Sequence, residues 1–97
     1  MRIESIIIKG YVYTFEYDKL NESFSFERFV SNRSWMYMYE WDRKLIEKIK
    51  KKFNWRSFTC NSEYNGFSVD YLDEAFMPKI KEYIINQIKN YHYKEEG

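Results

Sequence analysis

Aromatic and smaller or charged residues alternate in two neighbouring segments near the start of the chain. From Tyr11 to Tyr17 every second residue is aromatic, and the alternation returns from Ser23 to Phe29 after a turn-like segment at 18–22. A period of two is typical of strands that bury one face. The pattern therefore predicts an antiparallel hairpin with an aromatic inner face. An earlier strand is predicted over residues 3–8, with Gly10 at a bulge or tight turn.

A second hairpin is predicted around Asn65 and Gly66. An Asn-Gly pair between two alternating segments favours a two-residue type I′ turn. Counting outward from that turn gives the cross-strand pairs Tyr64–Phe67, Ser62–Val69 and Cys60–Tyr71. In this register the apolar residues, with Phe58, share one face, as a half-buried hairpin requires. The opposite face carries Thr59, Asn61, Glu63, Ser68 and Asp70.

Two further segments have apolar residues at helical spacing. The first, residues 43–53, leaves its basic residues to solvent and is ended by Asn54, a residue that tolerates the left-handed conformation. Its apolar stripe is Leu45, Ile46, Ile49 and Phe53. The second helix has Pro78 at a first helical position and is expected to fray from Tyr93 onward. Its buried stripe is Met77, Ile80, Tyr83, Ile84, Ile88 and Tyr91.

The segment from Trp35 to Trp41 fits two interpretations. As a strand, it places Trp35, Tyr37, Tyr39 and Trp41 on one face. As the start of a helix, it extends the stripe that continues at Leu45 but places Asp42 within that stripe. Asp42 is better explained as the N-cap of a helix that begins near Arg43. We therefore favour a strand followed by a helix.

Together these elements predict a single α+β domain over residues 1–97, in which a small antiparallel sheet packs against two helices in ββα–ββα order. The sheet has two hairpins and room for a fifth or sixth strand. Hydrophobic residues make up 44% and charged residues 32% of the 97 residues, a composition typical of folded rather than disordered or membrane-spanning chains. We expect no secretory signal at the N-terminus, and the single cysteine excludes an internal disulfide. A cytoplasmic location, in the cell or in an infected host, is expected.

Residues that carry chemistry are few. His92 is expected to face solvent and complement the dipole of the last helix, and Cys60 to be an inert core thiol. One cysteine and one histidine exclude a zinc site of the common type. Asp70, Asp73 and Glu74 match no EF-hand spacing, and phosphate-binding and nucleophile-elbow motifs are absent from the sequence. We expect no catalytic residue, no metal and no cofactor, hence no enzyme.

Composition and charge direct attention to binding. Aromatic residues reach 22%, with ten Tyr, eight Phe and three Trp, a bias that an AT-rich genome also produces. Net charge is only +1, yet residues 40–56 carry seven basic and three acidic side chains, whereas residues 57–77 carry four acidic and no basic ones. Lysines on a helix are ordinarily solvated, but here Trp41 and Trp55 flank them, as in proteins that contact phosphates and stack bases.

Two function classes fit this pattern. The first is a small protein-binding module, such as an inhibitor or adaptor that a phage or mobile element directs at a host defence protein. The alternative is a single-stranded RNA- or DNA-binding protein that uses the basic helix and its flanking aromatics. A homodimer through the aromatic surface is a third interpretation, and no membrane partner is expected. The candidate binding residues are Trp35, Tyr37, Tyr39, Trp41, Lys44, Lys48, Lys51, Lys52, Trp55 and Arg56.

Overall fold

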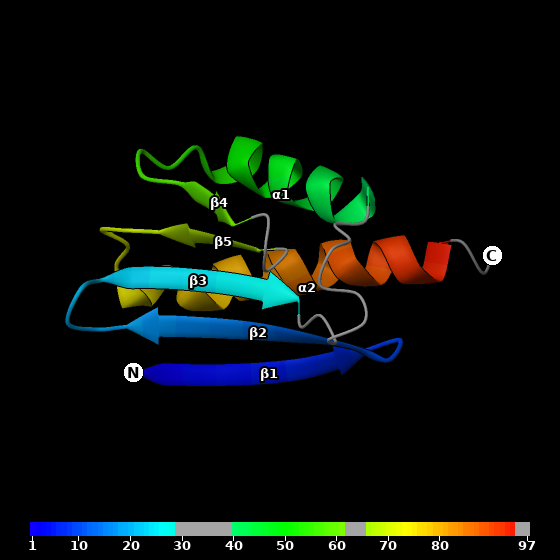
Figure 1. Cartoon of the computed structure of the whole chain (residues 1–97), viewed down its shortest axis with the longest axis horizontal. Helices are drawn as coiled ribbons and strands as arrows, with labels where there is room; N and C mark the ends of the chain where they lie inside the picture. Colours follow the sequence, from blue (N-terminus) through cyan, green and yellow to red (C-terminus); the bar gives the residue numbers. More distant parts are fainter. Residues whose placement is uncertain (29–39, 62–65, 95–97) are drawn as a thin grey trace.

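The chain forms a five-stranded antiparallel sheet with two α-helices (Figure 1). The computed structural model describes residues 1–28, 40–61 and 66–94. In chain order the elements are β1 (Arg2–Ile8), β2 (Tyr11–Asp18), β3 (Ser23–Arg28), α1 (Glu40–Phe53), β4 (Thr59–Asn61), β5 (Gly66–Val69), the 3₁₀ helix η1 (Glu74–Phe76) and α2 (Met77–Lys94). The strands lie in the order β1-β2-β3-β5-β4, and each neighbouring pair is antiparallel. The predicted α+β class is confirmed, with β1 as the fifth strand.

The alternation in β2 and β3 places one aromatic row inside the molecule. Phe15 pairs with Phe26, and Phe26 pairs in turn with Phe67 of β5, so the three side chains share a face across the centre of the sheet. Their ring centroids lie 5.3 and 5.7 Å apart. Burying such rings against one another is the main contribution that this sheet makes to stability. The buried residues of the sheet's inner face include Tyr13, Phe15, Tyr17, Phe24, Phe26, Phe67 and Val69.

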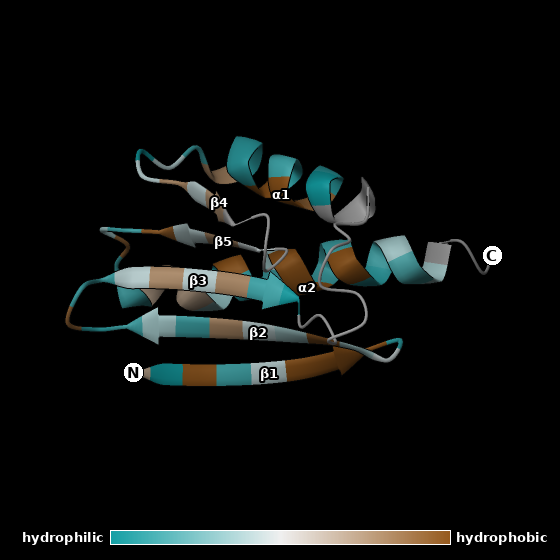
Figure 2. Cartoon of the chain, viewed as in Figure 1, coloured by the Kyte–Doolittle hydropathy of each residue, from teal (hydrophilic) through white to brown (hydrophobic). Residues whose placement is uncertain are grey.

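Both helices supply apolar side chains to that inner face. From α1 come Leu45, Ile46 and Ile49, and from α2 come chiefly Ile80, Ile84 and Ile88, all within one core cluster. Figure 2 shows the division along α1, whose brown side faces inward while its teal side faces away from the sheet. The predicted stripe of α1 is therefore confirmed. Asn54 ends the helix as expected, with a φ of 50° and its N–H bonded to the carbonyl of Lys50 at 2.9 Å.

The helix ends differ from the predicted ones. The first helix begins at Glu40, so Asp42 lies inside its first turn and is not the N-cap. Acidic side chains are favoured both at the N-cap and within the first turn, so the sequence signal for the two positions is the same. The strand predicted from Trp35 to Trp41 is therefore wrong at Glu40 and Trp41, which are helical, while residues 35–39 lie outside the described part of the chain. The second helix continues to Lys94, and Tyr93 is helical where fraying was predicted.

The predicted register of the second hairpin is wrong. Cys60 pairs with Phe67 and Asn61 with Gly66, so Gly66 belongs to β5 and is not a central residue of a two-residue turn. A Cβ atom on Gly66 would lie 2.0 Å from the carbonyl oxygen of Phe26 and 2.8 Å from the Cα of Glu27. The glycine therefore serves the close approach of β5 to β3, and this is why the Asn-Gly pair misled the turn prediction.

Two residues assigned to the core by that register lie at the surface. Cys60 is exposed on β4, the edge strand, where a side chain has a neighbouring strand on one side only. Tyr71 lies beyond the end of β5 at Val69 and is 86% exposed. Tyr71 was assigned to the core because the alternating pattern extends past Val69, the last residue of β5, whereas Cys60 pairs with Phe67 but lies on the edge strand.

The outer face of the sheet is mainly polar. The hydroxyls of Ser5 and Thr14 lie 3.2 Å apart, and Ser25 donates to a carboxylate oxygen of Glu16 at 3.5 Å. Burial raises the pKa of Glu27, and the neighbouring charge of Glu16 raises it further. Glu27 lies directly opposite Gly66 in the ladder, so the tight β3–β5 approach also accounts for its partial burial.

Substitution of the two internal glycines tests this packing. We expect Gly66→Ala to lower the free energy of unfolding by about 3 kcal/mol, because the added methyl meets backbone atoms that cannot move away. Gly10→Ala is the matched control. Gly10 has a φ of 83° with no atom near the added methyl, so only the conformational cost of about 1 kcal/mol applies. Urea unfolding followed by circular dichroism measures both, and equal losses would contradict the close-approach explanation.

Candidate binding surface

Three of the five basic candidate residues share one face of α1. Lys44, Lys48 and Lys51 are exposed and lie four and three residues apart, which places them on one helix face. That face is opposite to the buried Ile49. Arg56, also exposed, follows shortly after the helix ends. We refer to Lys44, Lys48 and Lys51 as the basic face of α1.

The aromatic candidates are distributed differently. The ring of Trp55 is parallel to that of Phe53, with centroids 4.8 Å apart, and it also stacks on Phe67 at 6.0 Å. It is therefore packed against the core, while Lys52 extends over the ring of Tyr83 with its Nζ 5.7 Å from the centroid. Trp35, Tyr37 and Tyr39 lie outside the described residues, and for Trp41 only the helical backbone is described.

His92 is not the solvent-facing residue that the sequence predicted. Its Nε2 lies 3.0 Å from the hydroxyl of Tyr13, and its ring stacks on Tyr11 with a centroid distance of 5.4 Å. The side chain is half-buried because the last turns of α2 cross the sheet at β2. His92 therefore fixes the end of the helix against the strand, a role that depends on tertiary contacts and has no local sequence signal.

Among the described residues, three large apolar side chains are exposed near the end of β2 that is remote from His92. Leu20 is 96% exposed in the turn between β2 and β3, and Tyr71 and Phe76 are 86% and 56% exposed after β5. The two segments are joined by a backbone hydrogen bond from the N–H of Leu72 to the carbonyl of Glu22 at 2.7 Å. We refer to residues 19–22 and 70–76 together as the loop-end surface.

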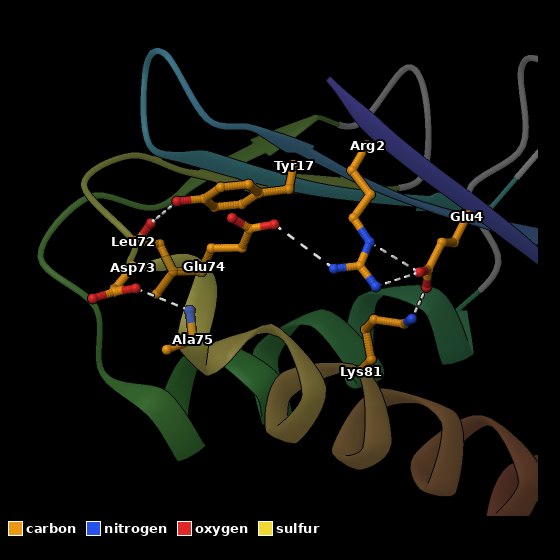
Figure 3. Close-up of polar contacts among 8 residues, drawn as sticks. All are labelled: Arg2, Glu4, Tyr17, Leu72, Asp73, Glu74, Ala75 and Lys81. Atoms are coloured by element: carbon orange, nitrogen blue, oxygen red, sulfur yellow. Dashed lines mark hydrogen bonds and ion pairs between the residues drawn. The ribbon is translucent and has the colours of Figure 1, made fainter.

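Leu72 anchors the loop-end surface to the core. Its side chain is buried, and its carbonyl accepts a hydrogen bond from the hydroxyl of Tyr17 at 2.6 Å (Figure 3). Both backbone groups of this residue are thus bonded to the β2–β3 hairpin. Asp73 then accepts from the N–H of Ala75 at 2.9 Å and starts η1. The segment that carries Tyr71 and Phe76 is therefore held in one arrangement.

The β2–β3 turn is fixed by one carboxylate. Asp18 accepts hydrogen bonds from the N–H of Leu20 at 3.1 Å, and from the backbone and side-chain amides of Asn21 at 3.4 and 2.7 Å. These bonds, first that from the Asn21 side chain, lower the pKa of Asp18. A charged cap of this kind holds the turn rigid at neutral pH, with Leu20 directed outward.

Tyr71 has an unfavourable backbone conformation. Its φ is 61°, in the left-handed region that Gly and Asn adopt readily but large side chains rarely do. The cost is about 1 kcal/mol or more for such a residue. The bonds of its neighbour Leu72 to Glu22 and Tyr17 hold the chain in place on the C-terminal side. Because the ring itself is exposed, its burial in the core does not offset the strain.

Acidic side chains surround the exposed apolar ones. Burial raises the pKa of the Tyr17 hydroxyl, and the charges of Glu22, Glu74 and Asp73 raise it further, since a phenolate there would lie among carboxylates. Asp70 is also exposed in this region and accepts a hydrogen bond from Ser57 at 3.4 Å. The loop-end surface is thus apolar with a mainly acidic border, in which Lys19 is the one basic residue, in contrast to the basic face of α1.

Within the residues that the structure describes, no group of three or more His, Cys, Asp or Glu side chains is arranged to hold a metal ion. The acids Asp70, Asp73 and Glu74 thus do not converge on a common point. In the same described part, neither helix has the length and apolar character needed to cross a membrane. Comparison with protein-family models, with curated proteins and with solved structures gave no significant match.

The sequence offered one missed signal for this surface. Leu20 is a large apolar residue between Lys19 and Asn21, in a segment correctly predicted to be a turn. An apolar side chain in such a turn has nothing to pack against and could have been singled out. For Tyr71 the signal was misleading, because its place in the alternating pattern assigned it to the core.

Removal of the Tyr17 hydroxyl tests the anchor. We expect Tyr17→Phe to lower the urea midpoint at pH 8, since the buried carbonyl of Leu72 loses its donor. Because the pKa of Tyr17 is raised in the folded state, stability depends on pH in a defined direction. The neutral hydroxyl contributes its full stabilisation below pH about 10, and this contribution is lost as the pH rises through the folded-state pKa. The stability difference between wild type and Tyr17→Phe should therefore shrink above pH 10. Tyr93→Phe, at a half-exposed ring, is the control, and a pH-independent difference would contradict the assignment.

Proposed function

We propose that this chain is a non-enzymatic protein-binding module whose contact site is the loop-end surface. The observation that carries the proposal is Tyr71, a large side chain that is 86% exposed in a left-handed backbone conformation. Glycine or asparagine at this position would remove the strain without loss of core packing. A residue that costs stability and contributes no burial has its use outside the fold, as strained residues at contact sites do.

The neighbours of Tyr71 support a protein partner. Leu20 and Phe76 add apolar area on the same joined segments, and Tyr and Phe are enriched at the centres of protein interfaces. The segments are fixed before binding by Asp18 and Leu72, so binding does not have to order them. A rigid, outward-directed aromatic residue is the kind of anchor that dominates interface energetics.

The acidic border indicates the chemistry of the partner. Glu22, Asp70 and Asp73 are exposed around the apolar side chains, so the complementary surface carries an apolar pocket bordered by Lys or Arg. A small module with one rigid contact site suits an inhibitor or adaptor. In this proposal it acts in the cytoplasm on a host protein, as a product of a phage or another mobile element.

The substitution Tyr71→Asn separates binding from folding. We expect it to raise the free energy of unfolding by about 1 kcal/mol, because asparagine tolerates the left-handed conformation. We also expect it to abolish partner capture, because the anchor is lost. Proteins retained from a lysate of the source cells by immobilised wild type and variant are compared by quantitative mass spectrometry. Tyr93→Asn, at a half-exposed tyrosine near the other end of the molecule, is the control.

The expected pattern is a protein retained by wild type and by Tyr93→Asn but not by Tyr71→Asn. Equal retention by all three chains would contradict the assignment of the loop-end surface. A loss of stability in Tyr71→Asn would contradict the argument from backbone strain, whatever the binding result.

Nucleic-acid binding is a second candidate because Lys44, Lys48 and Lys51 are aligned and exposed on α1. Since Trp55 packs on the core, we expect this binding to rest on phosphate contacts rather than base stacking.

For a labelled single-stranded oligonucleotide, three phosphate contacts predict that log K falls with log salt at a slope of about −2. The triple variant Lys44→Gln, Lys48→Gln, Lys51→Gln should lose this binding, and Tyr71→Asn should keep it. Fluorescence anisotropy at two salt concentrations decides the question, and no wild-type binding at low salt would remove the candidate.

A further inference from the structure

The first strand is a long sheet edge with exposed apolar side chains. Among the described strands, β1 lies at one end of the sheet and β4 at the other (Figure 1). Proteins ordinarily protect such edges by shortening them or placing charges on them. β4 has three residues, but β1 has seven, and its Ile3 and Ile7 are 57% and 72% exposed. The two edges are therefore not equivalent, and β1 is the one suited to pairing.

The turn after β1 determines which backbone groups face the open edge. Lys9 and Gly10 have φ values of 54° and 83°, the signature of a two-residue type I′ turn between Ile8 and Tyr11. In a type I′ turn the residue before the two central residues accepts a hydrogen bond from the residue after them. This directs the backbone N–H and C=O of Ile8 toward β2. Backbone direction alternates along an antiparallel strand. The N–H and C=O groups of Ile3, Ser5 and Ile7 are therefore directed to the open edge.

The strand is complementary to a second copy of itself. In an antiparallel pair centred on Ser5, every residue of β1 from Arg2 to Ile8 has a partner. Ser5 then lies opposite the partner's Ser5, and Ile3 opposite the partner's Ile7, so all three edge-directed residues form hydrogen-bonded pairs. A pair centred on Ile7 joins only Ile6 to Ile8, and pairs centred on neighbouring residues have the wrong backbone direction. One register thus satisfies the whole strand.

The charges of β1 do not oppose this pairing. Glu4 is its one acidic residue, and Arg2 lies 2.9 Å from a carboxylate oxygen of Glu4 while Lys81 of α2 forms an ion pair with the other (Figure 3). The negative charge of Glu4 is therefore compensated by basic residues of the same chain. On the outer face the strand presents Ile3, Ser5 and Ile7, which carry no charge, so two copies meet without repulsion there.

We infer that the chain forms a two-fold symmetric dimer in which β1 pairs with β1 of a second copy and the two sheets join into one. The exposed isoleucines then cover each other across the symmetry axis. Because the paired strands run in opposite directions, the two loop-end surfaces lie at opposite ends of the joined sheet. A dimer of this form is bivalent toward the partner of the proposed function, although the dimer itself does not depend on that function.

Charge substitutions on the outer face test both the dimer and its register. We expect sedimentation equilibrium to show a monomer–dimer equilibrium for wild type. The variant Ile3→Lys, Ile7→Lys should be monomeric, since each lysine lies opposite a lysine of the partner subunit. The variant Ile3→Lys, Ile7→Glu should dimerise in a salt-sensitive way, since unlike charges then lie opposite each other. Thr59→Lys, on the other edge strand, is the control and should dimerise like wild type.

A cross-link at the symmetry axis tests the register independently. In a Cys60→Ser background, Ser5→Cys places two thiols on directly paired residues, whose Cα separation of about 5.5 Å suits a disulfide. Mild oxidation should give a covalent dimer at high yield for this variant. Leu20→Cys in the same background, with a thiol at an equally accessible but distant position, should give little.

Three outcomes would overturn the inference. The first is a monomeric wild type at concentrations up to about 1 mM. The second is a dimer that persists in Ile3→Lys, Ile7→Lys, which would place the interface elsewhere. The third is equal cross-linking at positions 5 and 20. Tyr71→Asn should dimerise like wild type, so that failure of the dimer and failure of the loop-end surface remain distinguishable.

Discussion

The pairing of β3 with β5 is the constraint on which the rest of this structure depends. It is the link that joins the three N-terminal strands to the β4–β5 hairpin, and it brings the chain so close at Gly66 that no side chain fits. The same pairing aligns Phe26 with Phe67 and so completes the aromatic row of the core. Fixing β5 in this register also ends it at Val69, from where the chain reaches Leu72 and its bonds to Tyr17 and Glu22. The exposed position of Tyr71 is therefore a consequence of how β5 is held.

Much of the fold could be predicted because its signals are local. The alternation of Tyr13, Phe15 and Tyr17 and the helical stripe through Ile49 each repeat with the period of one element, and burial follows that period directly. The register of β4 with β5 could not be predicted in this way. It depends on whether Gly66 serves a turn or a neighbouring strand, and both uses exploit the same missing side chain. His92 shows the same limit, since its contact with Tyr13 joins residues far apart in the sequence.

The burial of the candidate binding residues was harder to predict than the fold. The period of a strand or helix separates its core residues from the remainder. Trp55 follows the period of no element and was therefore predicted to be a binding residue, but it packs on Phe53. The same criterion passed over Tyr71, because an alternating pattern does not show where a strand stops pairing. The exposure of the basic residues could be predicted, since exposed lysines such as Lys48 follow from helical geometry alone. Surface charge is thus readable from a sequence, whereas exposed aromatic residues require the tertiary structure.

Tyr71 and β1 share one physical property: the stability of the fold explains neither of them. Folding by itself favours neither a tyrosine in a left-handed conformation nor a seven-residue edge that exposes Ile3 and Ile7. Each feature lowers the stability or the solubility of an isolated chain, and a small domain has little stability to spare. A glycine or asparagine at position 71 and a charged residue at position 3 or 7 would remove both. The proposed pairing through β1 and the proposed contact of Tyr71 with another protein together account for both features.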